Sequence, residues 1–483
     1  MVRSLRPGPH RQAQKRNRAA FGHTPPSIEE DIPWKCRRLV IDTGTGAMPV
    51  MEEVNREARI AAKSDWPYRR QPKLSMPCRK IQTRLTRSYT LHARKLNPEP
   101  NWKWNSIAVL AACSLGGCMT QRGIPAAGTV VESRVVTTVD TQLAKSFLET
   151  SLAERARYDQ TKVVRALRAQ FDQRTMSWEL LRDLTHETSV DFATRYFIRR
   201  TLMDQRNAQW QSRFAALVRE LRARSELSIR KHLEERMELS RFRFLFVPGF
   251  HYRTDPSSGA DFAGPRTYLR NCGFDTQLVE VEEDGTIEQN AAFIAEAVRK
   301  ESSEGKRLII VSTSIGGPEA AVALGKLLSV DELRPVAAWI SVDGLLGGTV
   351  LADLAEQRPM SWLAKLAFLS KGIDPRAIPG VTTVSSRRRM TELRFPNSLL
   401  VLDYVGAPLS GQVAADVKGR WKTLARFGPN DGLTLLADEV LNSGRVVFAI
   451  GQDHYYRDAE IDLKALALAC LVLEQLAKTT FNG

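Results

Sequence analysis

Three residue types that can perform nucleophilic catalysis occur in order in the second half of the chain. Ser314 lies in Ser-Thr-Ser-Ile-Gly, Asp431 in Pro-Asn-Asp-Gly, and His454 in Gln-Asp-His. A serine hydroxyl is a weak nucleophile until a base takes its proton, and histidine commonly serves as that base. An acid then holds the imidazole in the correct tautomer and stabilises its charged form. The sequence therefore predicts Ser314 as nucleophile, His454 as base and Asp431 as acid.

Two of these assignments have competitors. His251 is the other histidine in this half of the chain, but it precedes the serine. Asp403 lies in an apolar segment close to a predicted strand end, where an acid could also reach the base. Asp453 adjoins His454 and is poorly placed to point at the neighbouring imidazole. We expect Asp431 as the acid and keep Asp403 as the alternative.

The residues around Ser314 have the layout of a nucleophile elbow, in which a serine sits at a tight turn between a strand and a helix. An apolar run at 307–311 leads into the turn, and an alanine-rich segment follows it. The positions two before and two after the serine must be small, because the backbone closes tightly there. Gly316 meets this need, and Ser312 replaces the usual glycine.

Apolar segments and helical segments alternate from residue 242 to the end of the sequence. This alternation is typical of an α/β fold with a mostly parallel sheet and helices on both faces. Functional groups in such a sheet collect beyond the carboxyl ends of the strands, and the three candidate residues each follow a different strand. The predicted strands are 242–247, 276–281, 307–311, 336–342, 398–404 and 445–450, and the predicted helices include 287–300 and 462–478.

The segment 241–483 resembles the α/β-hydrolase superfamily of serine esterases and lipases. The resemblance rests on VSTSIGG at 311–317, NDG at 430–432, DH at 453–454, VPGF at 247–250 and the turn Gly347-Gly348-Thr349. It implies cleavage of a small-molecule or lipid ester through an acyl-enzyme. It also implies that the backbone N–H groups of Ile315 and Phe250 stabilise the oxyanion. It implies no metal and no organic cofactor, and the sequence has no Gly-x-Gly-x-x-Gly or Walker motif.

Residues 350–397 form a long insertion at the position where lipase-like relatives carry a lid. An apolar helix in this insertion could line an acyl pocket, or it could pack without contacting substrate. Two other functions are compatible with the same motifs. One is a catalytically inactive binding or scaffold protein of this fold, and the other is a thioesterase, amidase or acyl transferase. The sequence gives no indication of the oligomeric state.

The net charge of +16 belongs mainly to the N-terminal segment. Residues 1–105 hold 22 Lys and Arg against 9 Asp and Glu, whereas the remainder is almost balanced. This segment is rich in Arg, Pro and Gln and has few periodic apolar positions, so we expect it to be disordered. The body of the chain therefore gives no indication of nucleic-acid binding.

A short apolar run at 107–119 lies within a segment, 106–129, that resembles a secretory signal followed by a linker. The run is too short to span a bilayer as a helix but fits the apolar part of a signal peptide. Leu-Ala-Ala-Cys113 and Leu-Gly-Gly-Cys118 both resemble the bacterial lipobox, with Cys118 preferred for lipidation. This interpretation predicts membrane attachment in a bacterial cell envelope and a natural start downstream of Met1. The alternative is a buried helix or loop in a cytoplasmic protein.

The segment 130–240 has helical character. Phe214, Leu217, Val218 and Leu221 follow the i, i+3, i+4, i+7 spacing of an amphipathic helix. No Pro or Gly occurs between Gly128 and Pro248 to interrupt helices. The six cysteines show no Cys-x-x-Cys pair, so we expect neither a zinc site nor a disulfide scaffold.

Overall fold

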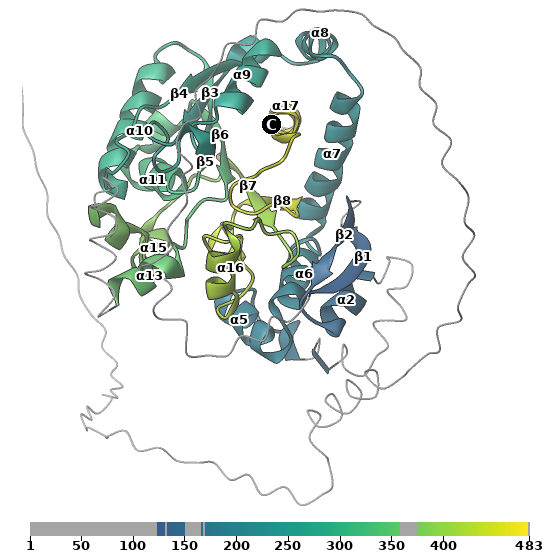
Figure 1. Ribbon diagram of the computed structural model, residues 1–483. Coiled ribbons are helices and arrows are strands. Elements are labelled where there is room, and N and C mark those ends of the chain that lie inside the picture. The colour runs from purple at the N-terminus through teal and green to yellow at the C-terminus, as the bar shows by residue number, and fades with distance from the viewer. Residues whose placement is uncertain (1–122, 131–132, 150–165, 168–169, 358–374, 482–483) are drawn as a thin grey trace, which may run out of the picture. The chain divides into compact units, whose positions relative to one another are not determined.

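A computed structural model describes residues 123–130, 133–149, 166–167, 170–357 and 375–481, which contain a six-stranded parallel sheet (Figure 1). The strand order is β4-β3-β5-β6-β7-β8, and each neighbouring pair is parallel. The prediction of a mostly parallel sheet is confirmed. The strands are β3 (Phe242–Val247), β4 (Asp275–Leu278), β5 (Arg307–Thr313), β6 (Val336–Val342), β7 (Leu400–Ala407) and β8 (Arg445–Ile450).

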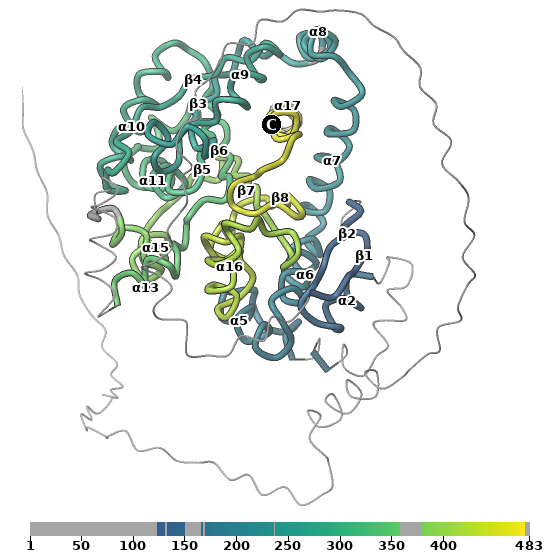
Figure 2. The backbone as a smooth tube through the Cα atoms, viewed as in Figure 1, coloured from purple at the N-terminus to yellow at the C-terminus, as the bar shows by residue number. Residues whose placement is uncertain are grey.

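Helices cover both faces of this sheet, because alternate strand residues point to opposite sides. On one face, Ile309 and Val311 of β5 pack with α7, α9 and α17. On the other face, Leu308 and Ile310 pack with α10 and α11. Figure 2 follows the chain from β8 into α17, which packs against both α7 and α9. The covering helices are α7 (Gln205–Arg222), α9 (Ala263–Asn271), α10 (Ile287–Ser302), α11 (Gly316–Val322) and α17 (Ile461–Phe481).

An antiparallel hairpin precedes the helices of the N-terminal region. It consists of β1 (Ile124–Val130) and β2 (Ser133–Val139). The expectation of helix from about residue 130 is therefore wrong for β2. The β2 sequence is mostly Val and Thr, whose branched side chains favour strands. Val135 and Val139, which lie on the same face of the strand, are buried. The absence of Pro and Gly from this segment does not distinguish a strand from a helix.

The helices that follow the hairpin pack at the β8 edge of the sheet. Val446 and Phe448 of β8 belong to the same apolar cluster as the hairpin, α2, α5 and α6. The Ser189 side chain caps α6 by accepting the backbone N–H of Phe192 at 3.2 Å. These helices are α2 (Gln142–Glu149), α5 (Trp178–Glu187) and α6 (Val190–Thr201). The later helix α8 (Glu226–Arg236) instead contributes Ile229 and Leu233 to the apolar cluster that includes α9.

Short elements complete the part of the chain that the structure describes. They are η3 (Leu239–Arg241), η4 (Pro256–Ser258), η5 (Ala323–Leu327), α12 (Val330–Leu333), α13 (Val350–Glu356), η6 (Pro375–Val381), α15 (Thr383–Glu392), α16 (Lys418–Ala425) and η7 (Leu436–Asp438).

Several predictions on the N-terminal third and the insertion lie outside the described residues. These are the disordered segment 1–105, the lipidation candidates Cys113 and Cys118, and the centre of the insertion at 358–374. Among the described helices, none is long and apolar enough to cross a membrane. Cys272 and Cys470 are buried free thiols.

Candidate active site

Ser314 lies at the tip of a tight turn between β5 and α11. Its φ of +54° falls in the left-handed region, which a residue with a side chain rarely adopts. The turn is fixed to the sheet, because the Ser314 N–H donates to the carbonyl of Val342 at 3.2 Å. A glycine is required at 316, where an added Cβ would lie 2.5 Å from the carbonyl oxygen of Pro248. The predicted elbow geometry is therefore present.

Ser312 departs from the usual glycine of this turn for a reason that the structure shows. Its side chain is buried, and its Oγ accepts a hydrogen bond from Nε1 of Trp339 at 2.8 Å. Trp339 lies on the neighbouring strand β6 and is also fully buried. Since a buried indole N–H needs an acceptor, the hydroxyl at 312 has a structural role.

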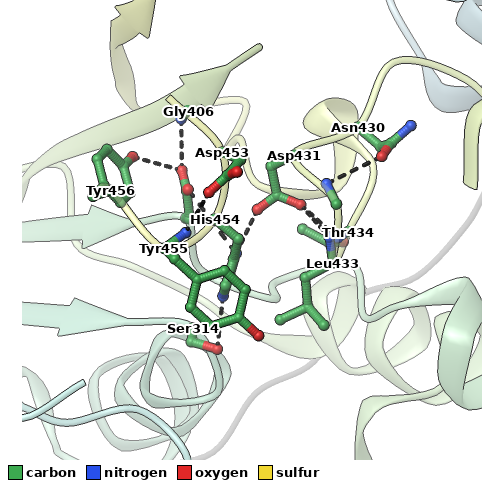
Figure 3. A network of polar contacts seen from close by, with 12 residues as sticks. Ser314, Gly406, Asn430, Asp431, Leu433, Thr434, Asp453, His454, Tyr455 and Tyr456 are labelled. Atoms are coloured by element: carbon green, nitrogen blue, oxygen red, sulfur yellow. Dashed lines mark hydrogen bonds and ion pairs between the residues drawn. The ribbon is translucent and has the colours of Figure 1, made fainter. Parts of the chain in front are cut away.

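His454 follows β8 and lies beside Ser314. Its Nε2 is 3.1 Å from Oγ of Ser314, and its Nδ1 makes a short hydrogen bond with Oδ2 of Asp431 (Figure 3). The imidazole side chain is only 6% exposed. Burial lowers the pKa of His454, but the charge and hydrogen bond of Asp431, with Asp343 in addition, raise it above the ordinary value. The structure brings the three predicted residues into one hydrogen-bonded line.

Asp431 is held rigidly in the loop between β7 and β8. Its Oδ1 accepts the backbone N–H groups of Leu433 and Thr434, each at 2.7 Å, which leaves Oδ2 for the imidazole. The carbonyl of Asp431 also accepts the backbone N–H of His454 at 3.0 Å. The acid and the base are thus linked through both side chain and backbone.

The competing residues point elsewhere. Asp403 lies inside β7, where it pairs with Ser341 and Val446 and accepts the Leu441 N–H at 2.9 Å. Asp453 accepts the backbone N–H groups of Ala414 and Tyr455. Neither carboxylate has a described hydrogen bond with the imidazole.

His251, the alternative base, lines the same cavity but has hydrogen-bond partners of its own. Its Nε2 lies 3.2 Å from Oδ1 of Asp284, and its Nδ1 lies 3.1 Å from Oγ1 of Thr254. Neither ring nitrogen is therefore directed at the serine.

The two predicted oxyanion donors lie beside the serine. Ile315 directly precedes α11, where backbone N–H groups have no partner within the helix. Phe250 follows Gly249, whose added Cβ would lie 3.3 Å from Cβ of Ser314. Both residues line the same cavity as Ser314. Their placement is compatible with the role that the sequence predicts.

Asp343 is a further acid at this site, and the sequence reasoning did not identify it as one. It follows β6 directly and is buried, and its Oδ2 lies 4.0 Å from Nδ1 of His454. Burial, followed by the charge of Asp431, raises the pKa of Asp343 to about 7. The sequence feature that could have identified Asp343 is its position after a predicted strand, which the three predicted residues share.

Asp343, Asp431 and His454 offer donor atoms within 4.8 Å of one another, a spacing that a cation could use. However, both ring nitrogens of His454 already form hydrogen bonds, to Asp431 and to Ser314. A cation would have to replace the proton on Nδ1 and break the link to Asp431. The hydrogen bonds therefore fit proton transfer better than metal binding.

A cavity of about 1640 Å³ opens at Ser314 and is mainly apolar. One side is formed by buried residues of the sheet and α17, among them Phe246, Val311, Ile340 and Leu468. The other side is formed by α13 and η6, with Leu351, Ala352, Ile378 and Val381. Charged residues at the cavity wall are Asp255, Glu283, Asp284 and Arg420.

No family model and no curated protein matches the chain by sequence. A structure of the metagenomic carboxyl esterase MGS0156 is 20% identical, covering 50% of this chain and 77% of the esterase at a TM-score of 0.40. Mature Bacillus licheniformis lipase BlEst2 is also 20% identical, with 50% and 94% covered and a TM-score of 0.40. Legionella pneumophila phospholipase PlaB is 14% identical, with 41% and 45% covered and a TM-score of 0.31. Similarity at this level says nothing about the reaction, which has to be argued from the residues of this chain.

Proposed function

We propose that this chain, which has the α/β-hydrolase fold, is a serine hydrolase that cleaves carboxylic esters. The observation that carries the proposal is the hydrogen-bonded line from Ser314 through His454 to Asp431, in which each residue follows a different strand. The elbow at Ser314, with its positive φ, presents the hydroxyl to the cavity. A serine, a base and an orienting acid in this arrangement are the components of nucleophilic acyl transfer.

The proposed reaction proceeds through an acyl-enzyme. His454 Nε2 takes the proton of Ser314 as Oγ attacks the ester carbonyl carbon, and Asp431 stabilises the resulting imidazolium. The N–H groups of Ile315 and Phe250 would donate to the oxyanion of the tetrahedral intermediate. The imidazolium then gives its proton to the leaving alkoxide. Water, activated by the same base, hydrolyses the acyl-enzyme and restores the free serine.

The apolar cavity supports an ester with an apolar acyl group as substrate. Val311, Ile340 and Phe246 are each at least nine-tenths buried, so this side of the cavity excludes water from an acyl chain. The insertion 350–397 contributes α13 and η6 to the opposite wall, which supports a pocket-lining role for this part of it. A thioesterase, amidase or acyl transferase would use the same residues on a different carbonyl compound.

Esters of p-nitrophenol with rising acyl length, together with matched thioester and amide substrates, test this proposal. We expect release of p-nitrophenol by the wild-type chain and almost none by Ser314→Ala. Preference for the thioester or amide would favour that chemistry instead. A folded protein without activity on all three classes would favour the inactive scaffold.

Lipidation of Cys118, or of Cys113, remains a proposal that rests on the lipobox-like sequence alone. It would attach the protein to a membrane in a bacterial envelope. Intact mass of the protein produced from its native gene tests it. A mature chain that begins at one of these cysteines and carries acyl groups supports the proposal, and an unprocessed chain without acyl groups contradicts it.

A further inference from the structure

Two carboxyl groups, and not one, face the same nitrogen of His454. Asp431 Oδ2 accepts the hydrogen bond of Nδ1, and Asp343 Oδ2 lies 4.0 Å from that atom. The two acids come from different strand ends, since Asp343 follows β6 and Asp431 lies between β7 and β8. A triad needs only one acid to orient its imidazole.

Asp343 is held in place by both its backbone and its side chain. Its φ of +42° is unfavourable for a residue with a side chain, and its N–H donates to the carbonyl of Tyr404 at 3.0 Å. Its Oδ1 accepts the Gly406 N–H and the Tyr456 hydroxyl, each at 2.7 Å. An added Cβ on Gly406 would lie 2.8 Å from Oδ2, so a glycine leaves room for the carboxylate. Backbone strain of this kind persists where the surroundings fix it and is common at functional sites.

The second carboxylate oxygen of Asp343, Oδ2, is the one that lies near the base His454. Oδ2 is buried and has no hydrogen-bond donor of good geometry among the described residues, and the carboxyl of Glu439, in the loop before β8, also interacts with the side chain of Asp343. A buried carboxylate oxygen without a donor is costly, so a positive charge forming nearby would stabilise it. The imidazolium that forms on His454 during the reaction is such a charge, at 4.0 Å.

The charged and titratable groups around Asp343 agree with this role. Besides His454, the groups that act on the pKa of Asp343 are Asp431 and the Tyr456 hydroxyl. Burial raises the pKa of Tyr456, followed by the charge of Asp343. Burial also raises the pKa of Tyr404, followed by the charges of Asp458 and then Asp343. Burial, and then the charges of Asp343 and Asp431 with a side-chain hydrogen bond to Asp343, raise the pKa of Glu439 well above its ordinary value.

Arg420 is the basic group that acts on the imidazole, and its charge lowers the pKa of His454. The cluster behind the imidazole therefore holds two acids, Asp431 and Asp343, and burial followed by the charge of Asp431 raises the pKa of Asp343 to about 7.

We propose that Asp343 is a second positioning acid for His454. In its ionised form it stabilises the imidazolium together with Asp431. When Asp431 is replaced, Asp343 accepts the hydrogen bond of the Nδ1–H group of His454. The inference rests on the proposed serine hydrolase function. It predicts that the site tolerates loss of Asp431 better than a triad with a single acid, in which the Asn variant loses about 10⁴-fold in kcat.

The test is a double-mutant cycle on kcat/KM, with Asp431→Asn, Asp343→Asn and the double variant. Asn at 343 keeps an acceptor for Gly406 and Tyr456, and Asn at 431 keeps one for Leu433 and Thr434. We expect losses of about 10²-fold for D431N and about tenfold for D343N, and about 10⁴-fold for the double variant, which exceeds the product of the single losses.

The pH profile gives a readout that a merely structural role would not move. Because a nearby negative charge raises the pKa of a histidine, D343N should shift the acidic limb of kcat/KM about one pH unit downward. The matched control is Asp191→Asn in α6, a buried acid whose pKa is also raised to about 7 by burial and by Asp140 but which lies outside the cavity wall. D191N should leave the limb in place, even if it lowers stability.

The outcomes separate this inference from the proposed function. Three results in an active wild-type enzyme would together overturn the inference alone. D431N would already lose about 10⁴-fold in kcat/KM, and D343N would have the same effect in the wild type and in D431N. The acidic limb of the pH profile would also be unchanged by D343N. Absence of Ser314-dependent hydrolysis in the wild type would instead overturn the proposed function. If D343N does not fold, Asp343→Glu replaces it in the test. Because Glu keeps a carboxylate, the acidic limb of this variant should stay at the wild-type pH. A limb shifted downward, as expected for loss of the charge, would contradict the inference.

Discussion

His454 Nε2 lies 3.1 Å from Ser314 Oγ, although 140 positions separate the two residues in the chain. The sheet brings them together, because β5 and β8 both end at the same edge and the residues follow those ends. Each residue is also fixed by contacts of its own: Ser314 by the hydrogen bond of its N–H to Val342, and His454 by its hydrogen bond to Asp431. The distance is therefore set before any substrate is bound, as preorganised catalysis requires.

Removal of the hydroxyl at 314 is expected to abolish hydrolysis without unfolding the chain. Ser314→Ala should lower kcat by about 10⁴-fold or more, because the remaining residues have no nucleophile to activate. Ester hydrolysis and the far-ultraviolet circular dichroism spectrum check this. Ser257→Ala is the matched control, since Ser257 lines the same cavity but bonds to Asp255. Equal losses in the two variants would contradict the assignment.

The two candidate acids should behave differently when each is replaced by Asn. Asp431→Asn should lower kcat/KM by about 10²-fold, because it removes the carboxylate from Nδ1. Asp403→Asn should keep activity within about threefold, because this side chain accepts the Leu441 N–H and has no described hydrogen bond with the imidazole. Steady-state kinetics on both variants decide between the acids. A larger loss in D403N than in D431N, with both proteins folded, would reverse the assignment.

Activity should fall in acid with an apparent pKa above the ordinary histidine value of about 6.5. His454 must be neutral to accept the serine proton. Burial lowers its pKa, but Asp431 and Asp343 together raise the pKa by more, so that it lies above the ordinary value. As pH falls through this raised pKa, the base becomes protonated and kcat/KM is lost. A profile of kcat/KM against pH measures this, and an acidic limb well below pH 6.5 would be inconsistent with the described site.

Restoring the usual glycine at 312 should destabilise the protein. Ser312→Gly leaves the buried Trp339 Nε1 without its acceptor and adds backbone freedom to β5. We expect a decrease of about 1–3 kcal/mol in the free energy of unfolding, with activity retained. Urea denaturation measures the decrease. Trp339→Phe removes the donor as well, so Ser312→Gly should cost less in that background, and an equal cost would show that the hydrogen bond is not the cause.

The acyl chain is expected to occupy the side of the cavity next to α17. Ala465 lies on this side and Ala355 on the side of α13, and both line the cavity. Ala465→Trp should therefore raise KM for long p-nitrophenyl esters about tenfold and leave short ones nearly unchanged. Ala355→Trp is the matched control with the same added volume. If only Ala355→Trp discriminates against long esters, the chain lies under α13 instead.

Most of the fold was predictable because strand and turn signals are local. The apolar runs at 307–311, 336–342 and 445–450 agree with β5, β6 and β8 to within two residues. The segment of β2 was not predicted, because its Val and Thr residues carry the only signal and no Gly or Pro borders it on the C-terminal side.

The choice between Asp403 and Asp431 depended on where β7 ends. The sequence predicts an end at Tyr404, which would leave Asp403 at the strand end. The strand runs to Ala407, so Asp403 moves into the sheet interior and its side chain meets Leu441. Asp343 was missed for a related reason. Its contact with His454 depends on which strand ends lie side by side and on its positive φ, and neither follows from local composition.

The most direct test of the central proposal is labelling by a fluorophosphonate probe, followed by peptide mass spectrometry. An activated serine attacks the phosphorus and keeps the label, whereas ordinary serines do not react. We expect a single labelled peptide that contains Ser314, loss of labelling in Ser314→Ala, and strongly slowed labelling in His454→Ala. An unlabelled wild-type protein, or labelling that persists in Ser314→Ala, would contradict the proposal that Ser314 is the nucleophile.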